Sequence, residues 1–349
     1  MAVSANAVSL AQYGLMSNNP LVTGITFGLL QNSIVLQDIP IPTKASMIVN
    51  GNRWVGSLPG VNWSKLNVDP VVVSGTPSTF QEQVFIPRNA IDVDRWILVD
   101  QNQIVDPRQA QLQAYLKSFA YDYNAKFINN SPTNAYSLTG NTTDAITGIR
   151  HRIDNPMQYG VKMNAGGTAE AKIDAGGTAA AIGPTNRSAT TGQAFLEKLD
   201  QLLWAVDAPD GTNVILYMND DVIRKFQTVL RLMGSSALDI TRDNYDRQIM
   251  TYKNAVIRDI GYNVDQTTRI ITSTESNTGA NSTSTFSSIY AIRADLDHFF
   301  AWQMAEMIAQ DVGLVGNGGS TYRMVFDWAT GLIQIHPRAI GRLYDISVN

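Results

Sequence analysis

The chain has 349 residues, of which 44% are apolar and 16% are charged, a composition typical of a folded protein with a large core and not of a disordered or fibrous chain. It has no cysteine and three histidines, which excludes disulfides, thiolate metal sites and cysteine nucleophiles and leaves little for a zinc or iron centre. Its formal net charge is −4, from 26 basic and 30 acidic residues without a basic cluster, so tight binding of nucleic acid is not expected.

The N-terminal residues 1–33 are rich in Asn, Ser, Gly and Leu and have no sustained periodicity. This pattern indicates an arm that lies on another surface and not an independent unit. The segment also lacks the charged head and apolar stretch of a signal peptide, and no run in the chain is apolar over about 18 residues. A cytosolic product is therefore the simplest expectation.

Strand-like runs alternate with turn formers from residue 34 to residue 86, and they include "SIVLQDIPIP", "SMIVN", "PVVVS" and "EQVFIP". No helical period connects these runs. A segment so extended and so often broken by turns can hardly form a core alone. The pattern therefore favours a long hairpin that folds back against a neighbouring part of the structure. A small barrel is the alternative.

The clearest predicted helix follows Asp106, the expected N-cap, with Pro107 at its first position. A single apolar stripe then runs at helical spacing to Ser131 and Pro132, which end it. The stripe consists of Leu112, Tyr115, Leu116, Phe119, Tyr123 and Phe127. Because no polar residues converge on these aromatics, the stripe predicts core packing and not a cofactor site.

The rest of the chain mixes helices and strands without regular alternation. One helix carries apolar residues from Phe195 to Val206, and the strand from Asn213 to Met218 leads into a helix capped by Asn219 or Asp220. Strand-like runs follow, with one further helix predicted through "LDHFFAWQMAEMIAQ", residues 296–310. Such a mixture predicts the α+β class and argues against a doubly wound sheet or an eightfold barrel.

Three motifs contain residue types that could form a chemical site. The doubled "AGGTA" in residues 164–183 lacks the lysine of a phosphate loop and the three spaced glycines of a dinucleotide loop, so it predicts a surface or contact loop. His298 beside two acids is interpreted as a cap or surface pair near a helix start. The cluster Arg242, Asp243, Asp246 and Arg247 predicts an ion-pair network, solvated or between subunits, with a cation site as the minor alternative. No catalytic residue, cofactor or metal ligand is predicted.

Several stretches resemble the major capsid proteins of tailed double-stranded-DNA bacteriophages, which have the Hong Kong 97-like fold. They are "GIRHRIDNPMQYGVKM", "KIDAGGT", "FLEKLDQLLWAVDAPDGTNVILYMNDDVIRKF" and "YDRQIMTYKNAVIRDIGYN". The resemblance extends over residues 34–349 and rests on similarity and element order, not on a chemical signature. It implies the following parts: an N-terminal arm, 1–33; an extended β-hairpin loop, 34–86; a peripheral domain, 87–205, with a spine helix at 107–130 and returning strands at 320–337; and an axial domain, 206–319, with a C-terminal strand at 338–349.

The resemblance also implies a function and a set of partners. The expected function is a structural shell protein that self-assembles into pentamers and hexamers of an icosahedral capsid around double-stranded DNA. Expected partners are further copies of the chain, portal and scaffolding or cement proteins, and packaged DNA in weak non-specific contact, with no membrane and no cofactor. The expected location is the virion, after assembly in the cytoplasm of the bacterial host.

Some relatives join their subunits through a Lys–Asn isopeptide bond. Lys44 and Lys65 lie in the implied loop, but no acceptor Asn and no catalytic Glu can be matched to them residue by residue. Cross-linking therefore stays a minor alternative.

The implied loop supplies the predicted subunit contacts. Large apolar side chains in a turn-broken segment are unusual on a monomer and often mark contact sites. The residues singled out are Arg53, Trp54, Leu58, Trp63 and Lys65, with both cations expected to form ion pairs with acids on an adjacent subunit. The alternative is that both tryptophans fold inward onto a small local barrel.

Three other functions stay open from the sequence. An encapsulin-type compartment would keep the fold and enclose cargo enzymes. A phage tail or fibre component would form rings, tubes or trimers. An enzyme with an unrecognised site is the alternative from a different class.

Overall fold

The computed structural model describes residues 32–53, 58–75, 77–99, 107–131, 145–177, 189–232, 238–242, 248–275, 286–315 and 319–348. Helices and strands both contribute to the fold, which confirms the α+β class. The described helices are α3 (Ile34–Asp38), α4 (Arg95–Val99), α5 (Pro107–Asn129), α6 (Ile149–Asp154), α7 (Pro156–Tyr159), α8 (Ala189–Ala205) and α9 (Asp220–Leu232). The described strands are β1 (Ile48–Arg53), β2 (Ser78–Gln83), β3 (Arg88–Asp94), β4 (Lys172–Gly177), β5 (Val214–Met218), β6 (Leu238–Arg242), β7 (Gln248–Tyr252), β8 (Ala255–Asp259), β9 (Phe286–Arg293), β10 (Phe299–Gln303), β11 (Ile308–Val315), β12 (Thr321–Asp327), β13 (Thr330–Gln334) and β14 (Ile340–Ser347).

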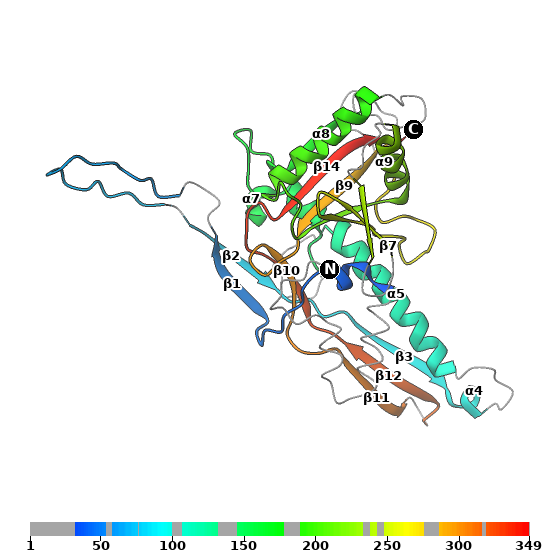
Figure 1. Cartoon of the computed structure of the whole chain (residues 1–349). Coiled ribbons are helices and arrows are strands. Elements are labelled where there is room, and N and C mark those ends of the chain that lie inside the picture. Colours follow the sequence, from blue (N-terminus) through cyan, green and yellow to red (C-terminus); the bar gives the residue numbers. More distant parts are fainter. Residues whose placement is uncertain are drawn as a thin grey trace.

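A seven-stranded mixed sheet forms the upper part of the molecule in Figure 1, in the order β4-β14-β9-β5-β8-β7-β6. Its central strand β5 is buried at every position, as an uninterrupted apolar run predicts. The Asn219 side chain caps the following helix, because its Oδ1 accepts a hydrogen bond from the Val222 N–H at 2.9 Å. Helices α8 and α9 meet through Phe195 and Phe226, whose ring centroids lie 6.0 Å apart.

The long helix α5 connects this sheet with a second, three-stranded sheet of order β11-β12-β3. Figure 1 shows α5 running along that sheet toward α4 at the far end of the molecule. Tyr115 of the helix packs on Phe326 of β12, with ring centroids 5.1 Å apart. Arg108 in its first turn forms an ion pair with Asp311 of β11.

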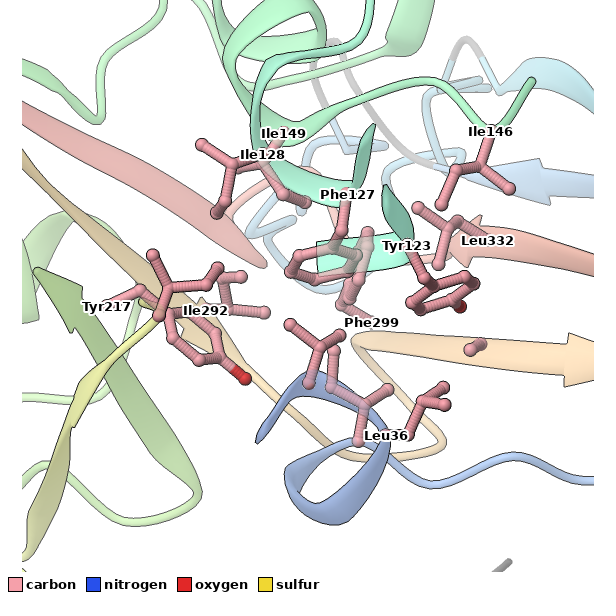
Figure 2. Close-up of a cluster of buried hydrophobic side chains, with 14 of the residues drawn as sticks. Leu36, Tyr123, Phe127, Ile128, Ile146, Ile149, Tyr217, Ile292, Phe299 and Leu332 are labelled. Atoms are coloured by element: carbon pink, nitrogen blue, oxygen red, sulfur yellow. The ribbon is translucent and has the colours of Figure 1, made fainter. Parts of the chain in front are cut away.

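The core beside α5 holds the apolar stripe predicted from the sequence. Tyr123 and Phe127 of α5 are buried together with Phe299, and Figure 2 shows them meeting Tyr217 and Leu36 from other elements. Leu116 and Phe119 are also buried, and Leu112 and Tyr115 pack at the edge of the same cluster. The predicted helix and its role in the core are therefore confirmed.

A two-stranded hairpin, β1 with β2, leaves the body on the other side. The strands pair antiparallel with Gly51 opposite Phe80. The chain beyond them, residues 58–75, extends far from the rest of the molecule (Figure 1) and forms no strand in its described residues. The hairpin expectation is confirmed and the barrel alternative is wrong for this part of the chain.

Besides the strand-like run "PVVVS", which forms no strand, two secondary-structure predictions are wrong. The run at "SIVLQDIPIP" begins with the short helix α3, which buries Val35 and Leu36 in the core next to α5. The predicted helix at 296–310 contains instead β10, buried throughout and paired with β13, and the start of β11. A short continuous apolar run has no period that separates a buried strand from a buried helix, so pairing with β13 decided the outcome.

The glycine-rich stretch is only in part a surface loop. Asn164 caps a tight turn, since its Oδ1 accepts hydrogen bonds from the N–H groups of Gly166 and Thr168. The second "AGGT" begins inside β4, which pairs parallel with β14 and buries Ala175. The loop expectation is therefore wrong for residues 172–177, because β14 offers an edge for parallel pairing and α8 packs on the resulting strand. Residues 178–188 lie outside the described residues.

The expected division of the chain at residue 205 falls within a packed unit. Helix α8 lies before that division, yet it packs on β4 and β14 and shares one apolar cluster with β5 and α9. Likewise β11 lies before residue 319 but pairs with β12. The packing therefore follows the two sheets and not the expected boundaries. The N-terminal arm, apart from residues 32 and 33, lies outside the described residues.

Candidate subunit interface

The base of the β1–β2 hairpin is a stack of four groups from distant parts of the chain. The ring of Phe80 lies over Gly51, where an added Cβ would come within 2.5 Å of the ring. The Arg53 guanidinium covers the ring from 4.6 Å. Gly160 closes the stack, because an added Cβ there would come within 2.4 Å of the Arg53 side chain. Two glycines are thus required for the close approach of these groups.

Arg53 is therefore not an exposed residue of a contact surface. Its side chain is only 5% exposed, and Nη1 donates a hydrogen bond to the Gln334 carbonyl at 3.1 Å. The expectation that Arg53 forms an ion pair with an adjacent subunit is wrong, since its guanidinium is enclosed by its own chain. Sequence alone did not reveal this, because Gln334 lies 281 positions away.

A buried ion pair ties β2 to the body. Arg152 of α6 is 1% exposed, and its guanidinium donates to both Glu82 carboxylate oxygens, at 2.6 and 3.0 Å. The same guanidinium donates from Nε to the Thr147 carbonyl at 3.2 Å and lies 5.2 Å from the Tyr159 ring centroid. Removing either partner would leave a charge buried without compensation.

Apolar packing completes the anchoring of the hairpin. Phe80 belongs to a small buried cluster with Phe300, Trp302 and Ile333 of the β10–β13 ribbon. Just after β2, the backbone of Phe85 exchanges hydrogen bonds with Thr330, at 2.8 and 3.0 Å. The base of the hairpin is therefore part of the core of the molecule.

The tip of the hairpin, residues 58–75, has the opposite character. Trp63 is 96% exposed, and Leu66 and Val72 are exposed to almost the same degree. Leu58 and Lys65 are exposed as well, as expected. The alternative of inward-folded tryptophans is wrong for Trp63. Trp54 lies outside the described residues, so its prediction stays a prediction.

The second predicted cluster stays a prediction too. Arg242 is the last residue of β6 and pairs with Gln248 of β7. Only its backbone belongs to the described part of the structure. Asp243, Asp246 and Arg247 lie outside the described residues. Among the predicted contact residues that the structure describes, Leu58, Trp63 and Lys65 are therefore exposed in the tip, whereas Arg53 is buried at the base.

A further apolar surface was not singled out from the sequence. Ile308, Val312 and Leu314 are exposed on β11, the outer strand of the three-stranded sheet. Only Ile308 of the three lies within the helix predicted for residues 296–310, and the bulge between Asp311 and Gly313 breaks the alternation that would have indicated a strand.

His298 lies in a turn between β9 and β10 and not at a helix start. Its Nδ1 lies 2.6 Å from Oδ1 of Asp295, and its ring centroid lies 4.8 Å from that of His336. Burial, followed by the nearby His298, lowers the pKa of His336. His336 Nδ1 accepts a hydrogen bond from the Arg338 N–H at 3.2 Å, which requires that nitrogen to be unprotonated. His298 and His336 thus stabilise the turn that joins β13 to β14. This structural role accounts for their geometry without a catalytic one.

Neither a metal nor a membrane is suggested by the described part of the chain. Its acidic and histidine side chains form no group of three placed to hold a metal ion. None of its helices is long and apolar enough to cross a membrane.

The fold has counterparts among solved structures, although no family model and no curated protein matches the sequence. The capsid of cyanophage A-1(L) aligns with a TM-score of 0.56 at 12% identity, over 99% of this chain and 96% of that one. The holo-SrpI encapsulin complex from Synechococcus elongatus PCC 7942 aligns with a TM-score of 0.55 at 10% identity, over 90% of this chain and 87% of that one. The capsid of a native GTA particle gives 0.55 at 11% identity, over 92% and 90% of the two chains.

These alignments span nearly the whole length of both chains, so the likeness concerns the complete arrangement of elements. At such low identity it establishes the fold alone. The chain has the Hong Kong 97-like capsid fold, which the resemblance in the sequence implied.

Proposed function

We propose that this chain is the major capsid protein of a tailed double-stranded-DNA bacteriophage, and that its copies form the pentamers and hexamers of an icosahedral shell. The single observation that carries the proposal is the hairpin, whose base is locked into the body while its apolar tip projects from it. A chain that has this fold and leaves such a tip uncovered gains the missing burial from a neighbouring copy.

The tip carries apolar side chains that its own subunit leaves exposed. Trp63, Leu66 and Val72 are almost fully exposed, and apolar burial contributes about 25 cal/mol per Å². The rigid base holds the tip outward, so the subunit does not fold it back to cover these side chains. Contact between copies covers them, with Trp63 as the anchor and Leu58 and Lys65 at its margin.

The remaining parts of the chain take the roles that the resemblance implies. Residues 1–33 are the N-terminal arm, the two sheets belong to the axial and peripheral domains, and α5 is the spine helix. The cluster Arg242, Asp243, Asp246 and Arg247 forms ion pairs across a contact between subunits. The role is structural and non-enzymatic, without a cofactor.

The partners follow from the same role. They are further copies of the chain, portal and scaffolding or cement proteins, and packaged DNA. With a net charge of −4 and no basic cluster, contact with DNA is weak and independent of sequence. The protein is located in the virion after assembly in the cytoplasm of the bacterial host.

Electron microscopy and sedimentation of the purified full chain test the proposal. Closed shells built from five- and sixfold capsomers are expected. A stable, compact monomer under every assembly condition would contradict it, and rings, tubes or trimers alone would indicate a tail component instead.

A compartment shell of the encapsulin type is the second candidate. It is favoured by one observation, the alignment of an encapsulin complex over 90% of this chain. The contents of particles purified from their natural source separate the two candidates. A phage shell contains genome-length DNA, whereas a compartment contains protein cargo that mass spectrometry identifies.

A further inference from the structure

The outer face of the hairpin base forms one wall of a groove that none of the interactions described above uses. Because successive side chains of a strand point to opposite faces, Phe80 and Glu82 turn toward the body while their neighbours in β1 and β2 stay exposed. Gln158 of α7 stands on the other side, and the groove has a volume of about 610 Å³. The exposed strand residues that line it are Asn50, Asn52, Thr79 and Gln81.

The described side chains that line this groove are all uncharged. The complete lining consists of Asn50, Gly51, Asn52, Thr79, Phe80, Gln81 and Gln158. Two charges in the same strands are turned away from it. Glu82 binds Arg152 on the body side, and Arg53 is held against the Phe80 ring with only 5% of its surface exposed. The groove therefore presents polar groups without an electrostatic preference for either sign of charge.

The amide and hydroxyl groups of the lining are available to a ligand. A side-chain amide offers an acceptor oxygen and an NH₂ donor, and a hydroxyl group donates and accepts. Within the described part of the chain, the polar side chains of the lining form no hydrogen bond with another residue. In the pairing of β1 with β2, Asn50 lies opposite Gln81, so two amides stand side by side on the same wall.

The two walls of the groove are fixed relative to each other. Arg53, the last residue of β1, packs against Gly160, which directly follows α7. On the other strand, the ion pair between Glu82 and Arg152 holds β2 to α6, and α6 leads directly into α7. In Figure 1, α7 accordingly lies next to the end of the hairpin that carries these contacts. A site held in place before binding loses less conformational freedom when a ligand enters.

These features specify the chemistry of the ligand. A phosphate or nucleic acid requires Lys or Arg to neutralise its charge, and an amphipathic helix requires an apolar wall. Neutral sugars instead carry hydroxyl groups that both donate and accept, which matches the amides, and C–H groups that can contact the edge of Phe80. The volume of about 610 Å³ lies within the range of about 300–1,000 Å³ of small-molecule sites, enough for a short oligosaccharide.

We propose that the groove between the β1–β2 hairpin and α7 binds a neutral oligosaccharide, either free or as a segment of an uncharged polysaccharide. Asn50 and Gln81 form hydrogen bonds with its hydroxyl groups from the hairpin, and Gln158 does so from α7. The edge of Phe80 contacts its C–H groups. Sugar binding is a function additional to the formation of a shell, and it does not depend on assembly of the chain.

Saturation-transfer NMR with the purified full chain tests the proposal. The neutral probes are maltotriose, cellotriose and triacetylchitotriose. The charged probes are trigalacturonate, an anion, and chitotriose, which carries cationic amino groups in place of the acetamides of triacetylchitotriose. At least one neutral probe should bind with a Kd of about 1 mM or tighter. The charged probes should bind at least about tenfold more weakly, because the groove offers their charges no partner.

Two variants locate the site in the groove. Asn50→Ala and Gln81→Ala each remove one amide and should weaken binding of the neutral probe by about three- to tenfold. Both side chains are exposed, so thermal melting should be unchanged and a loss of binding cannot come from unfolding. The matched control is Gln113→Ala, at an exposed glutamine of α5, a helix that Figure 1 shows apart from the hairpin. It should bind as the wild type does.

Three results would overturn the proposal and leave the shell function untouched. The first is no binding of any neutral probe at about 10 mM, or equal binding of the charged probes. The second is wild-type affinity in both groove variants, which would place the sugar elsewhere on the molecule. The third is binding by unassembled subunits that disappears in particles, which would show that a neighbouring copy, and not a sugar, occupies the groove.

Discussion

The base and the tip of the β1–β2 hairpin are parts of one continuous segment, yet they bury their side chains in opposite ways. At the base, Phe80 and Glu82 are enclosed by β13 and α6 of the same chain. At the tip, Trp63 is 96% exposed. The side chains of the base are buried by their own subunit. The apolar side chains of the tip can be buried only by contact with another molecule.

This difference separates two kinds of mutational effect. A change at the base alters interactions that exist in the isolated subunit, so it should appear in the free energy of unfolding. A change at the tip removes contacts that form only between copies, so it should leave unfolding unchanged and weaken assembly. Four experiments challenge this separation.

The largest effect is expected at the buried ion pair of the base. Arg152→Ala leaves the Glu82 carboxylate buried without its partner, which should lower the free energy of unfolding by about 3–5 kcal/mol. Chemical denaturation of unassembled subunits measures the loss. The matched control is Arg224→Ala, which removes an exposed arginine from ion pairs with Asp220 and Asp221 and should cost less than about 1 kcal/mol.

A double variant refines this experiment. Glu82→Leu with Arg152→Met replaces the ion pair by apolar side chains and should recover much of the lost stability. If Arg152→Ala lowers the free energy of unfolding no more than Arg224→Ala does, the ion pair between Arg152 and Glu82 does not anchor the base of the hairpin.

The next effect is expected at the tip. Trp63→Ala should change the free energy of unfolding by less than about 0.5 kcal/mol but reduce particle yield, because loss of an interface anchor costs about 2 kcal/mol or more at each contact. Sedimentation measures the yield, and thermal melting of unassembled subunits measures the stability. Trp204→Ala, at an exposed tryptophan on α8, is the control. A strongly destabilised subunit with normal particle yield would place Trp63 in a local core.

A pair of glycines allows the same substitution at both places. In Gly51→Ala the new Cβ would come within 2.5 Å of the Phe80 ring, so overpacking should cost about 1–3 kcal/mol. In Gly60→Ala the nearest atom is a Val73 methyl at 3.7 Å, so stability should be unchanged. Denaturation curves give the free energy of unfolding of each variant. Equal free energies for the two variants would show that the base is packed no more tightly than the tip.

The smallest effect is a pH dependence that belongs to the body and not to the tip, whose described residues contain no histidine. Burial, then His298, lowers the pKa of folded His336 below its ordinary 6.5. The unfolded chain therefore binds more protons, so this contribution to stability is present above pH 6.5 and is lost as the pH falls through the folded pKa. His336→Asn, which keeps an acceptor near the Nδ1 position, should lose less stability than wild type on acidification.

Asp38 acts in the opposite direction, so the comparison must be made as a difference between variants. Burial raises the pKa of this carboxyl to about 6, despite its contact with Arg258, and its protonation stabilises the fold as the pH falls. Unfolding curves from about pH 7.5 to about pH 5 for wild type, His336→Asn and Trp63→Ala give the answer. Trp63→Ala should follow the wild-type slope, and an altered slope there would mean that the tip contacts the body.

The parts of the fold predicted correctly have signals that are local in the sequence. The stripe in α5 repeats at helical spacing, and the Asn219 cap adjoins its own helix. The hairpin follows from the turn formers and the absence of helical period. The tip residues Leu58 and Trp63 were found because their surroundings cannot bury them.

The parts predicted wrongly depend on distant partners. The continuous apolar run of β10 became a strand because β13 pairs with it. Residues 172–177 became a strand because β14 offers an edge. Arg53 was assigned to a contact surface, but Phe80 and Gln334 enclose it.

The sequence by itself determined where the long helices α5, α8 and α9 lie, that the charge is nearly balanced and that a turn-broken apolar segment interrupts the chain. Only the tertiary structure decided which apolar residues of that segment are covered. Phe80 and Trp63 are both aromatic, but Phe80 meets Trp302 and Ile333 while Trp63 meets no core. Burial depends on surfaces supplied by residues far away in the chain, and local composition does not specify them.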